Sequence, residues 1–494
     1  MMNETELTRR NEALERELAR TKRLLRVTER DLQQTSAELE GIRSSRKWQL
    51  AEKLSHLIPR KKAPTAPAER PYTGTTVLCD EVLTPLVQPD ITPERTGPLS
   101  VSDYPMLQAP VYEVPKVSII IPVYNQFEFT YHCVESILEN TGNIPYEILI
   151  ADDCSTDLTA QITEILPGVR HIRNEHNLRF LLNCNNAAKY AKGQYILLLN
   201  NDTQVMENWL APLIYLMESD PQIGMVGSKL IYPDGHLQEA GGIIWNDGTG
   251  WNFGNGQNPD LPEFNYVKEA DFISGAAIML PRSLWETLGG FDEDFVPSYC
   301  EDSDLAFQVR KAGYKVMYQP QSVVVHFEGV SNGTDTGAGL KQYQVVNREK
   351  LLTKWRSDLR LHAQGGQELF LARDRSYLKP AVLLIAPTVS TLSAAGKLAH
   401  ELVKSGYNVK YLPADFRRPE PHTGLLQQMG VEVLYGEEYR RNWETWLSQF
   451  GQAIDLCIIT DARLETPYAQ AVKAHTGAKV IVCPEGDLGD FQFS

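Results

Sequence analysis

The sequence contains few cysteines, and they are irregularly placed. Seven occur in 494 residues, and no two of them form a C-x-x-C pair. A disulfide framework needs paired cysteines, and structural zinc sites usually use closely spaced pairs. The pattern therefore favours a protein of the reducing cytoplasm over a disulfide-bonded or zinc-binding protein.

Long apolar runs and an excess of basic residues are also missing. The sequence has no run of about 18 or more apolar residues, so we expect no transmembrane helix. Its first residues are charged throughout, which does not fit a secretory signal. Lys and Arg number 48 against 63 Asp and Glu, which gives a formal net charge of −15. This balance argues against nucleic acid as a partner.

The length predicts two or three domains, because a single hydrophobic core rarely extends over so many residues. Hydrophobic residues make up 42% of the chain and charged residues 22%, ordinary values for a globular protein. Changes in pattern divide the chain into five segments. They are 1–62 (coiled coil and basic amphipathic helix), 63–114 (linker), 115–356 (first α/β domain), 357–379 (connector) and 380–494 (second α/β domain).

The N-terminal segment has the pattern of a coiled coil. Residues 3–58 contain no Pro and a single Gly, and leucines recur at heptad spacing. This favours a coiled-coil homodimer, with a single solvated helix as the alternative. The heptad leucines are Leu7, Leu14, Leu18, Leu25, Leu32 and Leu39.

Residues 43–62 intersperse large apolar side chains with seven Lys and Arg residues. An amphipathic basic helix of this kind is suited to peripheral contact with the anionic inner face of a membrane. A plain end to the coiled coil is an equally good interpretation. Residues 63–114 are rich in Pro and Thr and are typical of a linker or an arm.

From Val117 onwards, apolar runs alternate with amphipathic helical patterns, which predicts a parallel sheet covered on both faces. The strands VSIIIPVYN, YEILIADDCSTD and QYILLLNND each end in polar residues. Ligands of open parallel sheets bind outside the carboxyl ends of the strands, so these three ends should converge on one site. The polar residues concerned are Tyr124, Asn125, Asp152, Asp153, Asn200, Asn201 and Asp202.

Several carboxylates at converging strand ends suit a divalent ion and a pyrophosphate, because Mg²⁺ and Mn²⁺ take oxygen ligands and bridge phosphates. A single Asp at such a position often just caps the next helix. Further along, Glu301, Asp302 and Asp304 precede an apolar helix, where acids facing the helix dipole are the simpler interpretation. His326 ends another apolar strand, where a hydrogen-bonded core histidine is the commoner case.

An ordered set of motifs resembles a known family. Between about residues 115 and 356 the chain contains SIIIPVYN, ILIADDCSTD, NEHNLRFLLNCNNAAKYAKGQYILLLNNDTQV, SGAAIMLPRSLWETLGGFDEDF, YCEDSDLAFQVRKAGYKV and VVVHFEG. In this order they resemble glycosyltransferase family 2, the inverting enzymes of GT-A fold. The resemblance covers about half of the chain. It is strongest to bacterial transferases that act on O-antigens, other surface polysaccharides or S-layer glycans, rhamnosyltransferases included.

The resemblance implies roles for individual residues. Asp202 stands at the D-x-D position and would hold Mn²⁺ or Mg²⁺ against the diphosphate, with His326 as a further metal ligand. Asp302 would be the catalytic base, with Glu301 beside it in the catalytic pair. The implied substrate-binding residues are Pro122, Tyr124, Asn125, Asp152, Asp153, Arg179, Asn185, Asn201, Ser274 and Gly275.

Two positions depart from the family pattern. The D-x-D position is Asn-Asn-Asp, so Asp202 is its only carboxylate. Arg179 stands where relatives often have Gly; it either contacts the diphosphate or changes the edge of the pocket.

The chemistry of inverting transfer agrees with these residue types. The reaction is one in-line displacement, which needs a base near the acceptor hydroxyl and charge neutralisation on the leaving diphosphate. We therefore expect an inverting glycosyltransferase that uses a UDP-, dTDP- or GDP-sugar and a glycan or lipid-linked acceptor. The alternatives are a non-catalytic scaffold of a polysaccharide assembly complex and, last, a sugar-phosphate nucleotidyltransferase. The latter would need a Gly-rich loop, and PVYNQFEF has no Gly.

The predicted fold is thus α/β: a GT-A domain preceded by a coiled coil and followed by a Rossmann-like lobe. That second lobe, at residues 380–494, resembles the N-terminal half of a GT-B glycosyltransferase and shows no Gly-rich phosphate loop. We interpret it as a docking or acceptor-recognition module.

Overall fold

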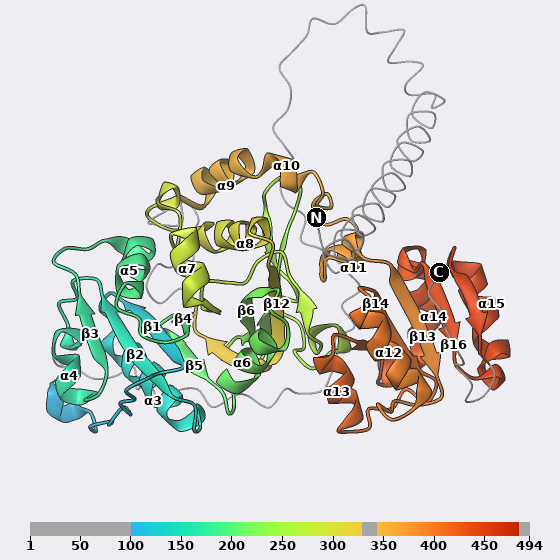
Figure 1. Ribbon diagram of the computed structural model, residues 1–494, viewed down its shortest axis with the longest axis horizontal. Helices are drawn as coiled ribbons and strands as arrows, with labels where there is room; N and C mark the ends of the chain where they lie inside the picture. The colour runs from blue at the N-terminus through green and yellow to red at the C-terminus, as the bar shows by residue number, and fades with distance from the viewer. Residues whose placement is uncertain (1–99, 329–342, 484–494) are drawn as a thin grey trace, which may run out of the picture. The chain divides into compact units, whose positions relative to one another are not determined.

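The computed structural model describes residues 100–328 and 343–483 (Figure 1). The predicted coiled coil, the basic helix and residues 63–99 of the linker lie outside these residues, so a coiled-coil dimer and membrane contact stay predictions. Within the described ranges, no helix combines the length and the apolar character needed to cross a bilayer. Of the described residues, 100–328, 343–376 and 380–483 belong to one compact unit that contains two large sheets.

The first sheet has ten strands in the order β10-β12-β6-β11-β4-β1-β2-β3, with β5 paired to β12 and β7 to β6. The strands are β1 (Val117–Val123), β2 (Tyr146–Asp152), β3 (Arg170–Arg173), β4 (Tyr195–Leu199), β5 (Thr203–Val205), β6 (Ile223–Ile231), β7 (Leu237–Glu239), β10 (Lys268–Glu269), β11 (Ala277–Pro281) and β12 (Lys315–His326). A separate hairpin joins β8 (Gly242–Ile244) to β9 (Gly250–Asn252).

The sheet is parallel only in part. Strands β3, β2, β1 and β4 are parallel, as the alternating pattern predicts. Strand β11, however, runs antiparallel to β4 and to β6, and β5 runs antiparallel to β12. The predicted parallel order therefore holds for the four strands from which it was drawn, and it does not extend to the other half of the sheet. A mixed sheet of this kind carries the GT-A domain.

Helices cover both faces of the sheet (Figure 1). Neighbouring residues of β1 alternate between the two faces, so Ile120 packs in one hydrophobic cluster while Ile119 and Ile121 pack in the other. Helices α3, α4 and α6 contribute to the second cluster, and α5, α7 and α8 to the first. The helices are α3 (Phe127–Asn140), α4 (Ile162–Ile165), α5 (Arg179–Ala188), α6 (Leu210–Ser219), α7 (Arg282–Leu288), α8 (Glu301–Lys311), α9 (Tyr343–Lys354), α10 (Arg356–Leu359) and α11 (Leu369–Ala372).

The second sheet is entirely parallel, in the order β15-β14-β13-β16-β17. Numbered along the lobe, this is the 3-2-1-4-5 order of a Rossmann-like fold, which confirms the predicted doubly wound lobe. The elements are β13 (Ala381–Ala386), α12 (Ala394–Lys404), β14 (Asn408–Pro413), α13 (His422–Gln428), β15 (Glu432–Val433), α14 (Glu437–Phe450), β16 (Leu456–Ile459), α15 (Glu465–His475) and β17 (Lys479–Val482).

A cluster of buried charges joins this second sheet to the segment that precedes it. The Nζ atom of Lys410, on β14, lies 2.7 Å from Asp374 Oδ2 and 2.6 Å from Glu432 Oε2. Arg373 donates to both carboxylate oxygens of Glu432 at 2.6 and 2.7 Å, and Tyr266 donates to Asp374 at 2.6 Å. All of these side chains are buried, so each carboxylate needs its cationic partners to offset the free-energy cost of burying its charge.

Candidate active site

The tip of β1 presents an exposed aromatic ring next to a closed polar turn. Tyr124 is 48% exposed, whereas Pro122 in the strand before it is buried. The amide of Asn125 donates to Ser155 Oγ at 2.8 Å, and its side-chain oxygen accepts from the amide of Thr156 at 2.8 Å. Asn125 therefore ties the end of β1 to the loop after β2 and leaves the Tyr124 ring free.

Asp152, the last residue of β2, is completely buried, and both of its carboxylate oxygens accept hydrogen bonds. Its Oδ1 accepts from the amide of Ser155 at 2.7 Å, and its Oδ2 contacts His171 Nε2 at 2.9 Å and the guanidinium of Arg173. Burial alone would raise the pKa of Asp152, but the hydrogen bonds from His171 and Ser155 and the charge of Arg173 outweigh it and lower the pKa to about 2. This carboxylate is ionised at any ordinary pH.

Asp153 fixes the loop that leads into α5. Its Oδ1 accepts from the amide of Leu178 at 2.6 Å and from Asn174 Nδ2 at 2.9 Å, and its Oδ2 accepts from the amide of Arg179 at 2.8 Å. These bonds hold Arg179 at a φ of 69°, a left-handed conformation that residues other than Gly seldom adopt. A Gly at this position would adopt the same conformation without a steric penalty. The Arg179 side chain is exposed.

The side-chain amide of Asn185 bonds the backbone of Phe291 at both of its ends. Its Nδ2 donates to the carbonyl of Phe291 at 2.8 Å, and its Oδ1 accepts from the amide of the same residue at 2.9 Å. Both ends of the amide are thus used to clamp α5 to the chain after α7. The contacts of Asn185 support a structural role and give no support to its predicted binding of substrate.

The antiparallel pairing of β5 with β12 brings the two predicted metal ligands together. Thr203 pairs with His326 in the ladder, and the carbonyl of Asp202 accepts from the amide of Phe327 at 2.9 Å. The Nε2 atom of His326 then lies 3.3 Å from Oδ1 of Asp202, and both side chains are buried. Neighbouring Asn201 turns inwards instead, where its Nδ2 donates to Thr130 Oγ1 at 3.2 Å.

The orientation of His326 is set by Gln238, a residue that the sequence did not single out. Gln238 Nε2 donates to the Glu328 carboxylate at 3.0 Å, so Gln238 Oε1 faces Nδ1 of His326, also at 3.0 Å. Because an amide oxygen can only accept, Nδ1 carries the proton. A neutral His326 therefore presents its Nε2 lone pair to Asp202, as a metal-binding imidazole does.

The predicted base lies at the start of α8. Asp302 Oδ1 accepts from the amide of Ser303 at 2.6 Å, and Oδ2 accepts from the amide of Gly275 at 3.1 Å. Burial raises the pKa of Asp302. Burial, and next the charge of Asp302, raise the pKa of Glu301, whose Oε2 is buried without a hydrogen-bond partner.

The segment Ser274–Ala276 connects this base to the tip of β4. The amide of Gly275 holds Asp302, and the carbonyl of Ala276 accepts from the amide of Asn200 at 3.0 Å. Asn200 is two residues from Asp202. The structure thus brings Asp202, His326, Asp302, Glu301, Ser274 and Gly275 into one region.

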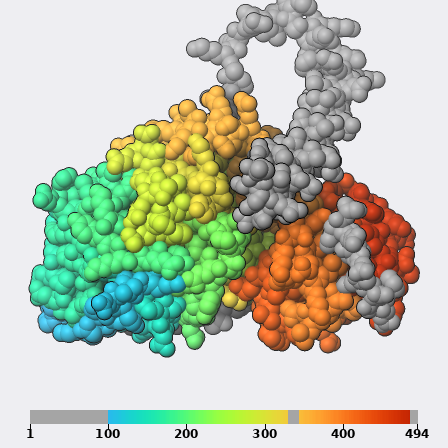
Figure 2. Space-filling model, in the orientation of Figure 1, coloured from blue at the N-terminus to red at the C-terminus, as the bar shows by residue number. Residues whose placement is uncertain are grey.

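Helix α9 holds the backbone just before the base. Tyr299 and Cys300 both have positive φ, at 76° and 68°, and residues in this region are strained. Buried Asn347 donates from Nδ2 to the carbonyls of Phe295, Ser298 and Tyr299 at 2.7, 2.8 and 3.1 Å. Trp355, directly after α9, donates from Nε1 to Asp304 Oδ1 of α8 at 2.6 Å. In Figure 2 the light orange surface of the segment that contains α9 adjoins the yellow surface of the segment that contains α7 and α8.

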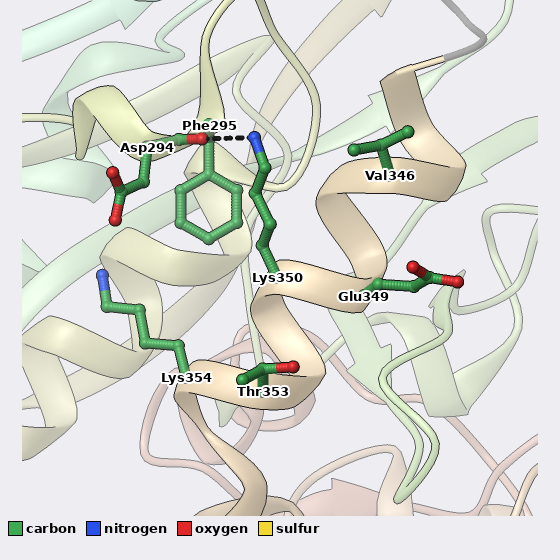
Figure 3. Close-up of a pocket in the computed structure, with 7 residues that line it drawn as sticks. All are labelled: Asp294, Phe295, Val346, Glu349, Lys350, Thr353 and Lys354. Carbon is green, nitrogen blue, oxygen red and sulfur yellow. Dashed lines mark hydrogen bonds between the residues drawn. The ribbon is translucent and has the colours of Figure 1, made fainter.

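A cavity of about 440 Å³ lies between α9 and the segment of Asp294 and Phe295 (Figure 3). In it, Lys350 reaches across to donate to the carbonyl of Asp294 at 2.6 Å, beside the Phe295 ring. None of the site residues predicted from the sequence lines this cavity. Its lining residues are Asp294, Phe295, Val346, Glu349, Lys350, Thr353 and Lys354.

The mixed sheet, with acidic residues at its strand ends and a carboxylate pair at the start of α8, defines a glycosyltransferase domain of the GT-A class. The family model of glycosyl transferase family 2 matches residues 118–288. This part of the chain is therefore similar to glycosyl transferase family 2.

Two known proteins are similar to this domain in sequence, and a solved structure is similar in part. The O-antigen biosynthesis protein RfbC of Myxococcus xanthus is 28% identical over 285 residues, which are 53% of this chain and 22% of that protein. An N-acetylglucosaminyl-diphospho-decaprenol L-rhamnosyltransferase of Mycobacterium tuberculosis is 25% identical over 256 residues, 46% of this chain and 82% of that protein. The chain thus spans less than a quarter of the length of the Myxococcus relative. A crystal structure of GalNAc-T7 with UDP, GalNAc and Mn²⁺ has a TM-score of 0.39 and 17% identity over 54% of this chain and 59% of that chain, which supports no conclusion about ligands.

Proposed function

We propose that the chain is a metal-dependent inverting glycosyltransferase that transfers a sugar from a nucleoside-diphosphate sugar to a growing bacterial surface glycan, such as an O-antigen or a capsule. The observation that carries the proposal is the link between the Asp202–His326 pair and Asp302 through the segment Ser274–Ala276. The names of the two relatives above, which concern O-antigen biosynthesis and rhamnosyl transfer, support the choice of a bacterial glycan.

The Asp202–His326 pair suits a divalent ion such as Mn²⁺ or Mg²⁺. Two ligands at right angles, each about 2.1 Å from an ion, lie about 3 Å apart, close to the 3.3 Å between Nε2 and Oδ1. Among the described residues, no group of three or more His, Cys, Asp and Glu side chains is placed to hold a metal. The donor's diphosphate and water would therefore complete the coordination. The bound ion would neutralise charge on the leaving diphosphate.

Asp302 would act as the general base. Its raised pKa makes it a stronger proton acceptor than a surface carboxylate, while Ser303 and Gly275 fix its two oxygens. The acceptor hydroxyl would lose its proton to Asp302 while its oxygen forms a bond to the anomeric carbon. The bond from that carbon to the diphosphate oxygen breaks on the opposite face, which inverts the anomeric configuration.

The donor nucleotide would lie across the ends of β1 and β2. Tyr124 offers an exposed ring on which a base can stack. Asp152 and Asp153 are committed to protein donors, so they would shape the pocket chiefly through the loops that they hold. Arg179, which is exposed at the start of α5, would contact the diphosphate.

The test is a donor screen with purified protein and Mn²⁺, in which nucleoside diphosphate release from UDP-, dTDP- and GDP-sugars is measured for the wild type, Asp302→Asn and Asp202→Ala. We expect release with one donor and its loss in both variants. Asp358→Asn, an exposed change, is the matched control and should behave like the wild type. Absence of release together with no metal-dependent thermal shift by any donor would instead favour a non-catalytic scaffold.

The remaining parts of the proposal rest on the sequence. We propose that the chain forms a homodimer through residues 1–62. It would be located in the cytoplasm, in peripheral contact with the inner face of the membrane. The lobe at 380–494 would recognise the acceptor or a partner in the assembly pathway.

A further inference from the structure

Two consecutive backbone amides in the site donate to two different carboxyl groups. The amide of Gly275 donates to Asp302 Oδ2 at 3.1 Å, and the amide of Ser274 donates to Glu239 Oε1, also at 3.1 Å. Glu239 is the last residue of β7 and is completely buried. The Ser274–Gly275 turn, which bonds the base Asp302, is therefore also bonded by a second acidic residue, Glu239.

Glu239 has unusual surroundings for a carboxyl group. Its Oε2 is buried without a hydrogen-bond partner. Burial, and after it the charge of Asp302 on α8, raise the pKa of Glu239 to about 8, against the amide of Ser274, which acts to lower it. The other ionisable group that faces it is Tyr318 on β12, whose pKa is raised well above its usual range, first by burial and then by Glu239. At neutral pH, burial and the charge of Asp302 thus together favour the uncharged form of Glu239.

We propose that Glu239 is a positioning residue that places the base Asp302 by holding the Ser274–Gly275 turn. This role rests on the proposed function, because it concerns the base of that reaction. An uncharged Glu239 can accept from Ser274 without repelling Asp302. Once it ionises, it sets a second negative charge next to Asp302 and favours a shift of the base away from Gly275.

The experiment compares Glu239→Gln, Glu239→Leu and the wild type. Gln keeps the shape and an acceptor oxygen for Ser274 but cannot ionise, whereas Leu removes the acceptor. Exposed Glu207→Gln is the matched control. Nucleoside diphosphate release is measured between about pH 6 and pH 9.5, and hydrogen exchange is followed in the peptide that contains Ser274 and Gly275.

We expect Glu239→Leu to lower kcat roughly tenfold to a hundredfold, with the donor KM within about twofold, since a misplaced base slows chemistry more than binding. Glu239→Gln should match the wild type near pH 7 and lack the fall in kcat that the wild type shows as pH rises through about 8. The exchange of the Ser274–Gly275 peptide should be faster in Glu239→Leu and unchanged in Glu239→Gln.

Each outcome bears on the proposal separately from the proposed function. Wild-type exchange in Glu239→Leu would overturn it, whether or not any donor reacts, because the turn would then not depend on Glu239. An alkaline fall in Glu239→Gln equal to that of the wild type would overturn it as well. Full activity in Asp302→Asn would instead refute the proposed function. If Glu239→Leu fails to fold, the pH profile of Glu239→Gln still decides.

Discussion

The Nε2 atom of His326 lies 3.3 Å from Oδ1 of Asp202, across the antiparallel ladder of β12 and β5. Gln238 keeps the imidazole proton on the far nitrogen, because its own amide is committed to Glu328. When His326 is neutral, its Nε2 atom and the Asp202 carboxylate are two acceptors that face each other, an arrangement that suits a shared cation.

Removing this orientation should weaken metal binding. In Gln238→Leu, Nδ1 of His326 loses its acceptor and the ring loses its preferred tautomer. We expect the Mn²⁺ affinity, measured by electron paramagnetic resonance titration with a nucleoside diphosphate present, to fall about 10- to 100-fold. Exposed Gln194→Leu should bind Mn²⁺ like the wild type. Equal affinities for Gln238→Leu and the wild type would show that Gln238 does not orient the ligand.

Substitutions of Arg179 should separate the effect of its strained backbone from the effect of its charged side chain. Its φ of 69° is accessible to Gly without a steric penalty, so Arg179→Gly should leave the free energy of unfolding unchanged or raise it by up to about 1 kcal/mol. The donor KM should rise, because the guanidinium is lost. Arg179→Lys, which keeps a charge and the strain, should retain much of the donor affinity. A clear loss of stability in Arg179→Gly would contradict the interpretation.

Asn347 should matter for catalysis although it lies in α9. Three backbone carbonyls before the base accept hydrogen bonds from its Nδ2. Asn347→Asp replaces the donor with an acceptor facing those carbonyls, so it should cost more stability than Asn347→Ala, which we expect to lose about 1–3 kcal/mol. Both should lower kcat. Urea unfolding and donor turnover measure the two effects, and a milder loss in Asn347→Asp than in Asn347→Ala would count against the clamp.

Asp152 predicts a pH-dependent contribution to stability. Its pKa is about 2 in the folded protein against 3.8 for the ordinary group, so its ionised form stabilises the fold at neutral pH. That contribution, about 2.5 kcal/mol, should be lost as pH falls from about 4 through 2. The stability gap between the wild type and Asp152→Asn should therefore narrow from pH 7 to pH 3 in urea unfolding. A gap that stays constant over this range would rule out the expected linkage.

The buried charges at Lys410 should hold the second lobe in place. Lys410→Met leaves the carboxylates of Asp374 and Glu432 short of a partner in a buried site. Breaking such a cluster on one side costs about 3–5 kcal/mol. Lys404→Met, at an exposed position on α12, should change stability by no more than about 0.5 kcal/mol. Urea unfolding of the two variants gives the comparison, and similar values for both would refute the role of the cluster.

Local sequence patterns predicted which segments form buried strands. The apolar runs that end at Val123, Asp152 and Leu199 are buried strands of one sheet, as their composition indicates. The antiparallel direction of β11 was not predictable, because an apolar run has the same pattern in either direction.

The site was predictable where residues act in short motifs and not where they act through distant partners. Asp202, Asp302 and His326 were expected from the resemblance, and the structure brings them into one region. The bonds of Asn185 to Phe291 were not predictable, because the two residues are distant in sequence; its binding of substrate stays a prediction. Gln238, Glu239 and Asn347 were missed because a buried polar residue gives no local signal of what it holds.

The support that α9 gives to the loop before α8 determines how short a working fragment of this chain can be. A fragment that ends at residue 288, where the family match ends, would include Asp202 but not Asp302 or His326. One that ends at residue 328 would include all three and still lack Asn347, leaving the strained residues before the base without their clamp. The shortest piece in which the base is held as described must therefore extend into α9 and include Asn347.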